Sequence, residues 1–207
     1  MTDSYLATRD QLRGLAESLI AGPQFRAAGT VRLAVRPAGF AGTALPIEIQ
    51  GTDLVWPDGR LALTGTLAEI GDAAGLTVGP PEGSYAVTDP LPPDQALAID
   101  PGAADTVYRS LYAGGQAVVE FAPDQHPVLW PEHFDVAVTV DEVNYGLSPG
   151  DAYHPGPYAY VGPWTARSGE FWNAPFGAAL PIEVAGRAEN AVVDTIVAFF
   201  ERGRSQL

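Results

Sequence analysis

Residues 133–145 read His-Phe-Asp-Val-Ala-Val-Thr-Val-Asp-Glu-Val-Asn-Tyr, the most regular alternation in the chain. Apolar side chains take every second position: Phe134, Val136, Val138 and Val140. Polar side chains fall between them, among them His133, Asp135, Thr139 and Asp141. Successive side chains of a β-strand point to opposite faces of the sheet, so the pattern predicts a strand with one apolar and one polar face. Such alternation is typical of antiparallel sheets with one face covered.

The remaining patterns predict a mixed fold. Alternation indicates strands in residues 30–36, 45–50, 61–67 and 118–121, and one that carries Tyr158, Tyr160 and Trp164 on one face. Apolar spacings of three and four predict helices over residues 4–21, 103–113 and 190–202, the first ended by Gly22-Pro23 and the second by Gly114-Gly115. We therefore expect an α+β fold: a mostly antiparallel twisted sheet, barrel- or sandwich-like, flanked by about three helices.

Composition limits the domain organisation and the chemistry. The 207 residues are 46% hydrophobic, enough for a sizeable core, and we expect a single domain over 1–207, with any weak division in the proline-rich residues 71–102. All 11 basic residues are arginine and cysteine is absent, which excludes a lysine Schiff base, a P-loop lysine and cysteine-ligated metals.

The net charge of −14 argues against nucleic acid and anionic membranes as partners, because both require a cationic surface. The first residues, Met1-Thr2-Asp3-Ser4, lack the basic and apolar regions of a secretory signal. We therefore expect a cytoplasmic protein.

One decapeptide has a near copy in the other half of the chain. Residues 42–51 and 177–186 share seven of ten positions around Leu-Pro-Ile-Glu. We interpret both as the beginning of an edge strand rather than as a duplicated half-domain, because nothing else recurs at this offset.

Aromatic residues and histidines concentrate in the second half of the chain. The segments are Leu129-Trp130-Pro131-Glu132-His133-Phe134-Asp135, Gly146-Leu147-Ser148-Pro149-Gly150-Asp151 and Pro157-Tyr158-Ala159-Tyr160. Over roughly residues 128–181 they resemble an uncharacterised bacterial, mainly actinobacterial-type, family with Leu-Trp-Pro-x-His-Phe-Asp, Gly-x-Ser-Pro-Gly-Asp and Pro-Tyr-x-Tyr segments. The resemblance implies a functional site here and names no reaction.

Our first hypothesis is a small-molecule-binding domain with its site in residues 130–173. Aromatic walls with a few placed polar groups are typical of ligand cavities. The expected ligand-binding residues are Trp130, Tyr145, Tyr158, Tyr160, Trp164, Trp172 and Asn173. His133 and Asp135 would supply the polar contacts.

Two alternatives remain open. In an enzyme, His133 and Asp135 would form a catalytic acid–base pair, or His133, Asp135, Asp151 and His154 would hold zinc, iron or manganese. The cofactor is left unknown. Gly146–Gly150 matches Gly-x-Ser-x-Gly, but the prolines that follow favour a turn over a nucleophile elbow. In an interaction protein, the aromatic residues would lie in a homodimer interface.

Overall fold

The computed structural model describes all 207 residues and confirms an α+β fold with antiparallel strands and flanking helices. The chain forms two compact units: unit 1 is Met1–Tyr108 with Trp130–Phe134, and unit 2 is Arg109–Leu129 with Asp135–Leu207. Residues 71–102 lie wholly in unit 1. The strand order is linear, so no barrel is closed. None of the helices combines the length and apolar character of a membrane span.

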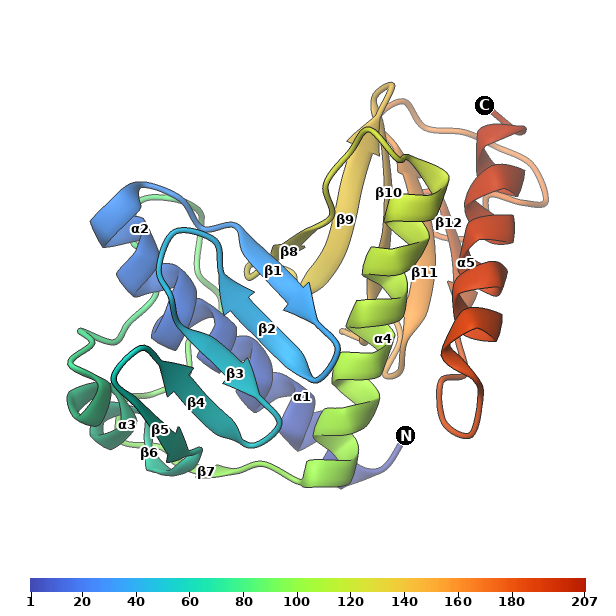
Figure 1. Ribbon diagram of the computed structural model, residues 1–207. Helices are drawn as coiled ribbons and strands as arrows, with labels where there is room; N and C mark the ends of the chain where they lie inside the picture. The colour runs from blue at the N-terminus through green and yellow to red at the C-terminus, as the bar shows by residue number, and fades with distance from the viewer. The chain divides into compact units, whose positions relative to one another are not determined.

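The main sheet of unit 1 is an antiparallel meander in chain order (Figure 1). Its strands are β1 (Leu33–Arg36), β2 (Gly39–Gly42), β3 (Glu48–Gln50), β4 (Asp53–Trp56) and β5 (Gly59–Ala62). The predicted strands at 30–36, 45–50 and 61–67 are each confirmed in part, whereas β2 and β4 were not predicted. Leu67 begins a helix, α3 (Leu67–Ala74), beside a small hairpin of β6 (Thr64–Thr66) and β7 (Ala96–Ala98).

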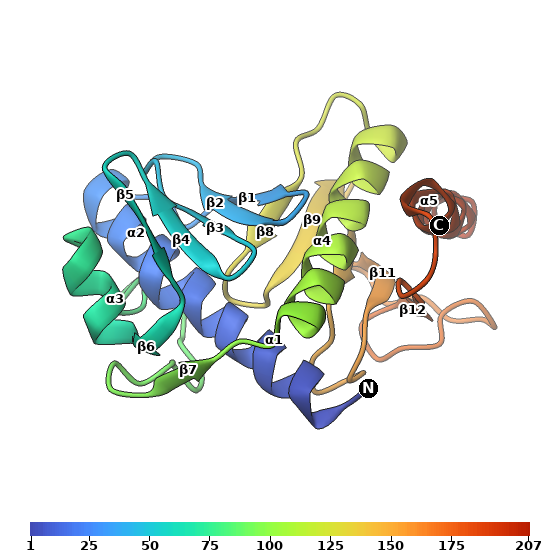
Figure 2. The same cartoon turned by 60° about the horizontal axis from the view of Figure 1, so that its bottom comes forward.

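One face of this sheet is the core of unit 1. Direct cross-strand partners Phe40, Ile49 and Leu54 are at most 1% exposed. Helix α1 (Asp3–Leu15) lies on one side of the sheet, and Figure 2 shows it from below. The opposite face of the sheet carries charged side chains, including Glu48, Asp53 and Arg60.

The first helical segment continues past its predicted end. After α1 the chain forms a π-helix, η1 (Ala16–Ala21), and then α2 (Gly22–Ala28), which ends at Gly29. The predicted stop at Gly22-Pro23 is wrong because the helix runs on through Pro23, and the Ser18 carbonyl oxygen, which faces the N–H that proline lacks, accepts instead from the Gly79 N–H at 2.9 Å. Gly22 serves close packing instead: a Cβ there would lie 1.8 Å from the Gly79 carbonyl oxygen.

The π-helix places a glutamate in the interior of unit 1. Glu17 is 1% exposed, its Oε1 accepts a 3.2 Å hydrogen bond from the Tyr85 hydroxyl, and its Oε2 has no hydrogen-bond partner. Burial raises the pKa of Glu17 above its ordinary 4.5, against the opposing effects of Tyr85 and Arg13. Buried carboxyl groups that lack a full set of partners destabilise the fold in their charged form.

We expect Glu17→Gln to flatten the pH dependence of stability. A pKa that is raised by folding contributes stability below the ordinary pKa, and that contribution is lost as pH rises through the folded value. The variant should therefore gain stability relative to the wild type as pH rises from about 4 to 8, measured by urea unfolding. The exposed Glu82→Gln is the matched charge control. A constant difference between the Glu17 variant and the wild type would contradict the prediction.

The sheet of unit 2 is also an antiparallel meander, of β9 (Asp135–Val140), β10 (Val143–Ser148), β11 (Tyr158–Pro163) and β12 (Ala178–Pro181). The single strand predicted over 133–145 is wrong: a two-residue turn, Asp141-Glu142, joins β9 to β10. Both turn residues have positive φ, 50° and 62°, as a tight hairpin turn requires. Asp-Glu lacks the Asn-Gly signal that marks such turns in a sequence.

Two helices carry residues of unit 2. Helix α5 (Glu189–Arg204) confirms the predicted last helix. Helix α4 (Pro101–Phe121) runs from unit 1 into unit 2, and the short strand β8 (Val128–Trp130) leads back. The predicted stop at Gly114-Gly115 and the predicted strand at 118–121 are both wrong. Gly114 lies where α4 packs on the sheet, since a Cβ there would be 2.7 Å from the Leu147 Cβ.

We expect Gly114→Val to destabilise the protein by about 1–3 kcal/mol, because the added side chain overpacks the contact between α4 and β10. Chemical denaturation measures the loss. Gly102→Ala, at the start of the same helix with 3.4 Å to its nearest neighbour, is the control and should be close to neutral. Equal effects of the two substitutions would contradict the assignment of Gly114 to helix–sheet packing.

Candidate functional site

The sheet of unit 2 has two different faces. On one face, Tyr145 packs with Phe121 of α4 and Phe200 of α5, at ring separations of 4.5 and 5.6 Å. The other face carries Tyr158 and Tyr160 of β11, as the sequence predicts, opposite Ser148 and Gly146 of β10. This second face, the outer face of the sheet, carries the polar groups of the candidate site.

Tyr160 reaches a carboxylate by crossing a neighbouring strand. Its hydroxyl donates a hydrogen bond to Asp135 Oδ2 on β9, and Gly146 of β10 lies between the two residues. A Cβ at Gly146 would lie 2.6 Å from the Tyr160 hydroxyl, so this crossing requires glycine. Burial and the Asp135 carboxylate raise the pKa of Tyr160 well above its ordinary 10.0, and the hydroxyl therefore keeps its proton.

A second tyrosine–aspartate pair lies beside the first. The Tyr158 hydroxyl donates a 2.6 Å hydrogen bond to Asp151 Oδ2, while Asp151 Oδ1 accepts from the backbone N–H groups of Tyr153 at 2.8 Å and His154 at 3.2 Å. Three donors thus hold the carboxylate in one orientation. Burial and Asp151 raise the pKa of Tyr158 above its ordinary value, so this hydroxyl also stays protonated.

The Gly-x-Ser-x-Gly match forms a turn, as the sequence predicts. The Ser148 hydroxyl oxygen accepts a 3.1 Å hydrogen bond from the Gly150 N–H, and β10 ends at Ser148 without a following helix. A nucleophile elbow needs a helix directly after the serine. The imidazole of His154 is likewise engaged locally, with Nδ1 2.8 Å from the Gly156 carbonyl oxygen.

The tyrosines of the two tyrosine–aspartate pairs pack with two further aromatic rings. We call Tyr153, Tyr158, Tyr160 and Phe176 the four-ring cluster. The Tyr153 ring lies 4.9 Å from that of Phe176 and 5.5 Å from that of Tyr158, both edge to face. Tyr158 is 4% exposed, whereas Tyr153 and Phe176 are 44% and 37% exposed. The hydroxyl groups of Tyr158 and Tyr160 therefore bind carboxylates, whereas the rings of Tyr153 and Phe176 are exposed to solvent.

Several predicted ligand-binding residues lie outside this cluster. Tyr145 belongs to the helix-covered face and is 1% exposed. Trp164 is 65% exposed and its indole N–H is 3.5 Å from Asn144 Oδ1. Trp172 packs edge-on against Phe171 at 5.0 Å, and Asn173 has a structural role, because its amide exchanges two hydrogen bonds with the backbone of Ala179.

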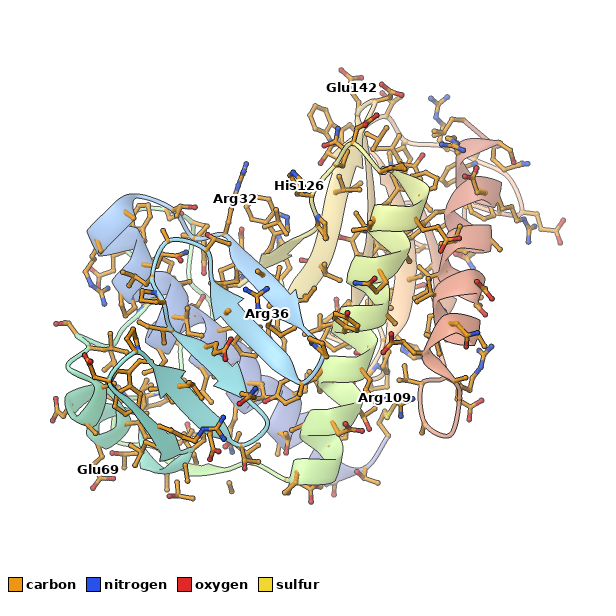
Figure 3. The ribbon with its side chains drawn as sticks, viewed as in Figure 1. Arg32, Arg36, Glu69, Arg109, His126 and Glu142 are labelled. Carbon is orange, nitrogen blue, oxygen red and sulfur yellow. The ribbon has the colours of Figure 1, made fainter.

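Trp130 belongs to unit 1. The guanidinium of Arg32 lies over its ring, 5.7 Å from the centroid. Figure 3 shows Arg32 projecting away from the ribbon. This pair is a partly exposed cation–π contact within unit 1.

His133 and Asp135 do not lie on one strand face as predicted. β9 begins at Asp135, and Phe134 has a φ of 51°, which interrupts the alternation. The His133 side chain is 72% exposed with Nε2 3.8 Å from Glu132, while Asp135 is 6% exposed. His133 belongs to unit 1, and the other three predicted metal ligands, Asp135, Asp151 and His154, belong to unit 2. No three His, Asp or Glu side chains are grouped so as to hold a metal ion.

No family model, curated protein or solved structure matches this chain. Of the predicted site residues, the structure brings together Tyr158, Tyr160, Asp135, Asp151 and His154. The sequence analysis did not select Gly146, Tyr153 and Phe176. A glycine directly opposite an aromatic residue would have indicated Gly146, but this signal can be read only once the strand register is known.

We expect Gly146→Ala to displace Tyr160 and to destabilise the protein by about 1–3 kcal/mol. In a double-mutant cycle with Tyr160→Leu, the cost of the alanine should fall but not vanish, because the leucine removes the hydroxyl and ring end that the new methyl group would meet, while the Val136 carbonyl oxygen at 2.7 Å remains. Urea unfolding of the four proteins measures the coupling. Additive effects, within about 0.5 kcal/mol, would show that Tyr160 is not what requires glycine at this position.

Proposed function

We propose that this protein binds a small organic cation, a substituted ammonium compound, at the four-ring cluster of unit 2. The observation that carries the proposal is the packing of two exposed aromatic rings, Tyr153 and Phe176, against the tyrosines of two tyrosine–aspartate pairs. Aromatic faces attract cations through their quadrupole, and fixed carboxylates strengthen that attraction. The net charge of −14 adds long-range attraction for the same ligand class.

The carboxylate nearer the surface is already oriented for binding. Asp151 is exposed, and its three hydrogen bonds hold it without a ligand. A cation that approaches Tyr153 therefore meets a fixed negative charge, and little reorganisation opposes binding. Tyr158 and Tyr160 keep their protons, because their pKa values are raised by burial and by the aspartates, and both hydroxyls therefore remain hydrogen-bond donors to the two carboxylates.

The arginines of unit 2 illustrate the same chemistry within the chain. Arg202 lies over the ring of Phe171 at 5.2 Å, and Arg204 over that of Phe121 at 4.7 Å. Arg109 and Arg187 bind backbone carbonyl groups of Arg187 and Ala191. These cations occupy other aromatic rings and loops, and the four-ring cluster keeps its outer faces open to solvent.

The test compares choline with 3,3-dimethylbutan-1-ol, its neutral carbon isostere, by isothermal titration calorimetry. We expect saturable binding of choline that weakens with added salt, and binding of the isostere that is weaker by about tenfold. Tyr153→Leu and Phe176→Leu should each weaken choline binding by about fivefold. Equal binding of the two ligands, or no binding of choline, would overturn the proposal.

Trp164→Leu is the matched control. Trp164 is an exposed aromatic residue of the same unit, 65% exposed, whose ring lies outside the four-ring cluster. Its replacement should leave choline affinity unchanged. A loss of affinity as large as that of Tyr153→Leu would mean that choline is attracted to any exposed aromatic ring rather than to this cluster.

A further inference from the structure

Unit 1 has a pocket of about 350 Å³ on its charged sheet face, opposite the helix-covered core. Ala41, Glu48 and Val55 are direct cross-strand partners and form part of its wall. The loop from Gly42 to Ile47 forms the other side, with Trp56 and Pro57 at the end of β4. The volume lies at the small end of the range for ligand pockets.

A buried glutamine holds this loop in place. Gln24 of α2 is 0% exposed, and its Oε1 accepts hydrogen bonds from the N–H groups of Ala44 at 2.7 Å and Leu45 at 3.3 Å. Its Nε2 donates to the carbonyl oxygens of Thr30 and Arg32. Both polar atoms of this amide, Oε1 and Nε2, thus make two hydrogen bonds each. The pocket wall is therefore formed before a ligand binds.

The pocket carries one charge of each sign. Arg36 Nε lies 4.0 Å from Glu48 Oε2, at the outer limit of an ion pair, and the two side chains are 49% and 36% exposed. Figure 3 shows Arg36 beside β1. A pair this loose and exposed stabilises the fold little. Arg36 Nη1 also donates a 3.1 Å hydrogen bond to the uncharged carbonyl oxygen of Val35, so both charges remain available to a ligand. An anion alone would meet Glu48, and a cation alone would meet Arg36.

The remaining wall is apolar. It is lined by Leu45, Pro46, Ile47, Val55, Trp56 and Pro57. A ligand that satisfies the whole pocket has a carboxylate and an ammonium group close together, and an apolar group beyond them. A free α-amino acid with an apolar side chain has this arrangement.

We propose that the pocket of unit 1 binds a free apolar α-amino acid, with its carboxylate on Arg36, its ammonium group on Glu48 and its side chain against Trp56 and the prolines. Guanidinium–carboxylate and ammonium–carboxylate hydrogen bonds are charge-assisted and directional, and they set the orientation of the ligand. This site is separate from the four-ring cluster, which belongs to unit 2.

The experiment titrates the full chain by calorimetry with three probes: L-leucine, L-leucinamide and N-acetyl-L-leucine. Leucinamide lacks the carboxylate and N-acetylleucine lacks the ammonium group. We expect saturable binding of leucine and a loss of about tenfold or more for each derivative. Equal binding of all three, or no saturable binding of leucine, would overturn the proposal.

Two variants separate the charges. Arg36→Gln should bind leucine no better than leucinamide, and Glu48→Gln should bind leucine no better than N-acetylleucine. Arg60→Gln removes another arginine of the same sheet face, one paired with Asp53 at 2.9 Å, and should leave leucine affinity unchanged. A loss with Arg60→Gln equal to that with Arg36→Gln would overturn the assignment. Choline binding is read on the same variants, so failure at either site is distinguished from failure at the other.

Discussion

A tyrosine hydroxyl withdrawn from water needs a hydrogen-bond acceptor, and this requirement organises the outer face of the unit 2 sheet. Tyr160 meets it by lying across Gly146 to reach Asp135. Phe176 then contacts the Tyr160 ring edge to face, at 6.3 Å between centroids. Tyr158 repeats the arrangement with Asp151, which in turn fixes the loop that carries Tyr153. The exposed aromatic surface thus depends on two partly buried tyrosine–aspartate hydrogen bonds.

In unit 1 a buried side chain again determines the shape of a surface loop. Gln24 follows the π-helix, and its amide ties the loop at Leu45 to the start of β1. A π-helix changes the direction in which the following side chains point, relative to a continuous α-helix. Glu17 within this irregular helix lies in the interior with an unbonded oxygen, and Gln24 beyond it binds the pocket loop.

Periodicity predicted the elements whose faces are chemically distinct. The last helix and the shared face of Tyr158 and Tyr160 are confirmed. The wrong predictions of element ends arise where one residue type is compatible with two different structural roles. Gly114 reads as a helix end, yet it allows α4 to approach the sheet, and Gly22 allows approach to Gly79. Asp141 and Glu142 read as strand, yet both adopt the positive φ of a tight turn. In each case the deciding contact is distant in sequence or set by pairing.

The two similar decapeptides show most directly that a similar local sequence can form its strand at different positions. Residues 42–51 place their strand at Glu48–Gln50, whereas residues 177–186 place theirs at Ala178–Pro181. The sequence by itself determined the α+β class, the antiparallel alternation and the residue types that gather near Asp135, because these depend on local periodicity. Tertiary structure decided which part of each decapeptide pairs with a neighbouring strand, which aromatic rings are exposed to solvent and which carboxylates the tyrosine hydroxyls bind. Those outcomes depend on register, and register is set by neighbouring strands and by turns such as Asp141-Glu142.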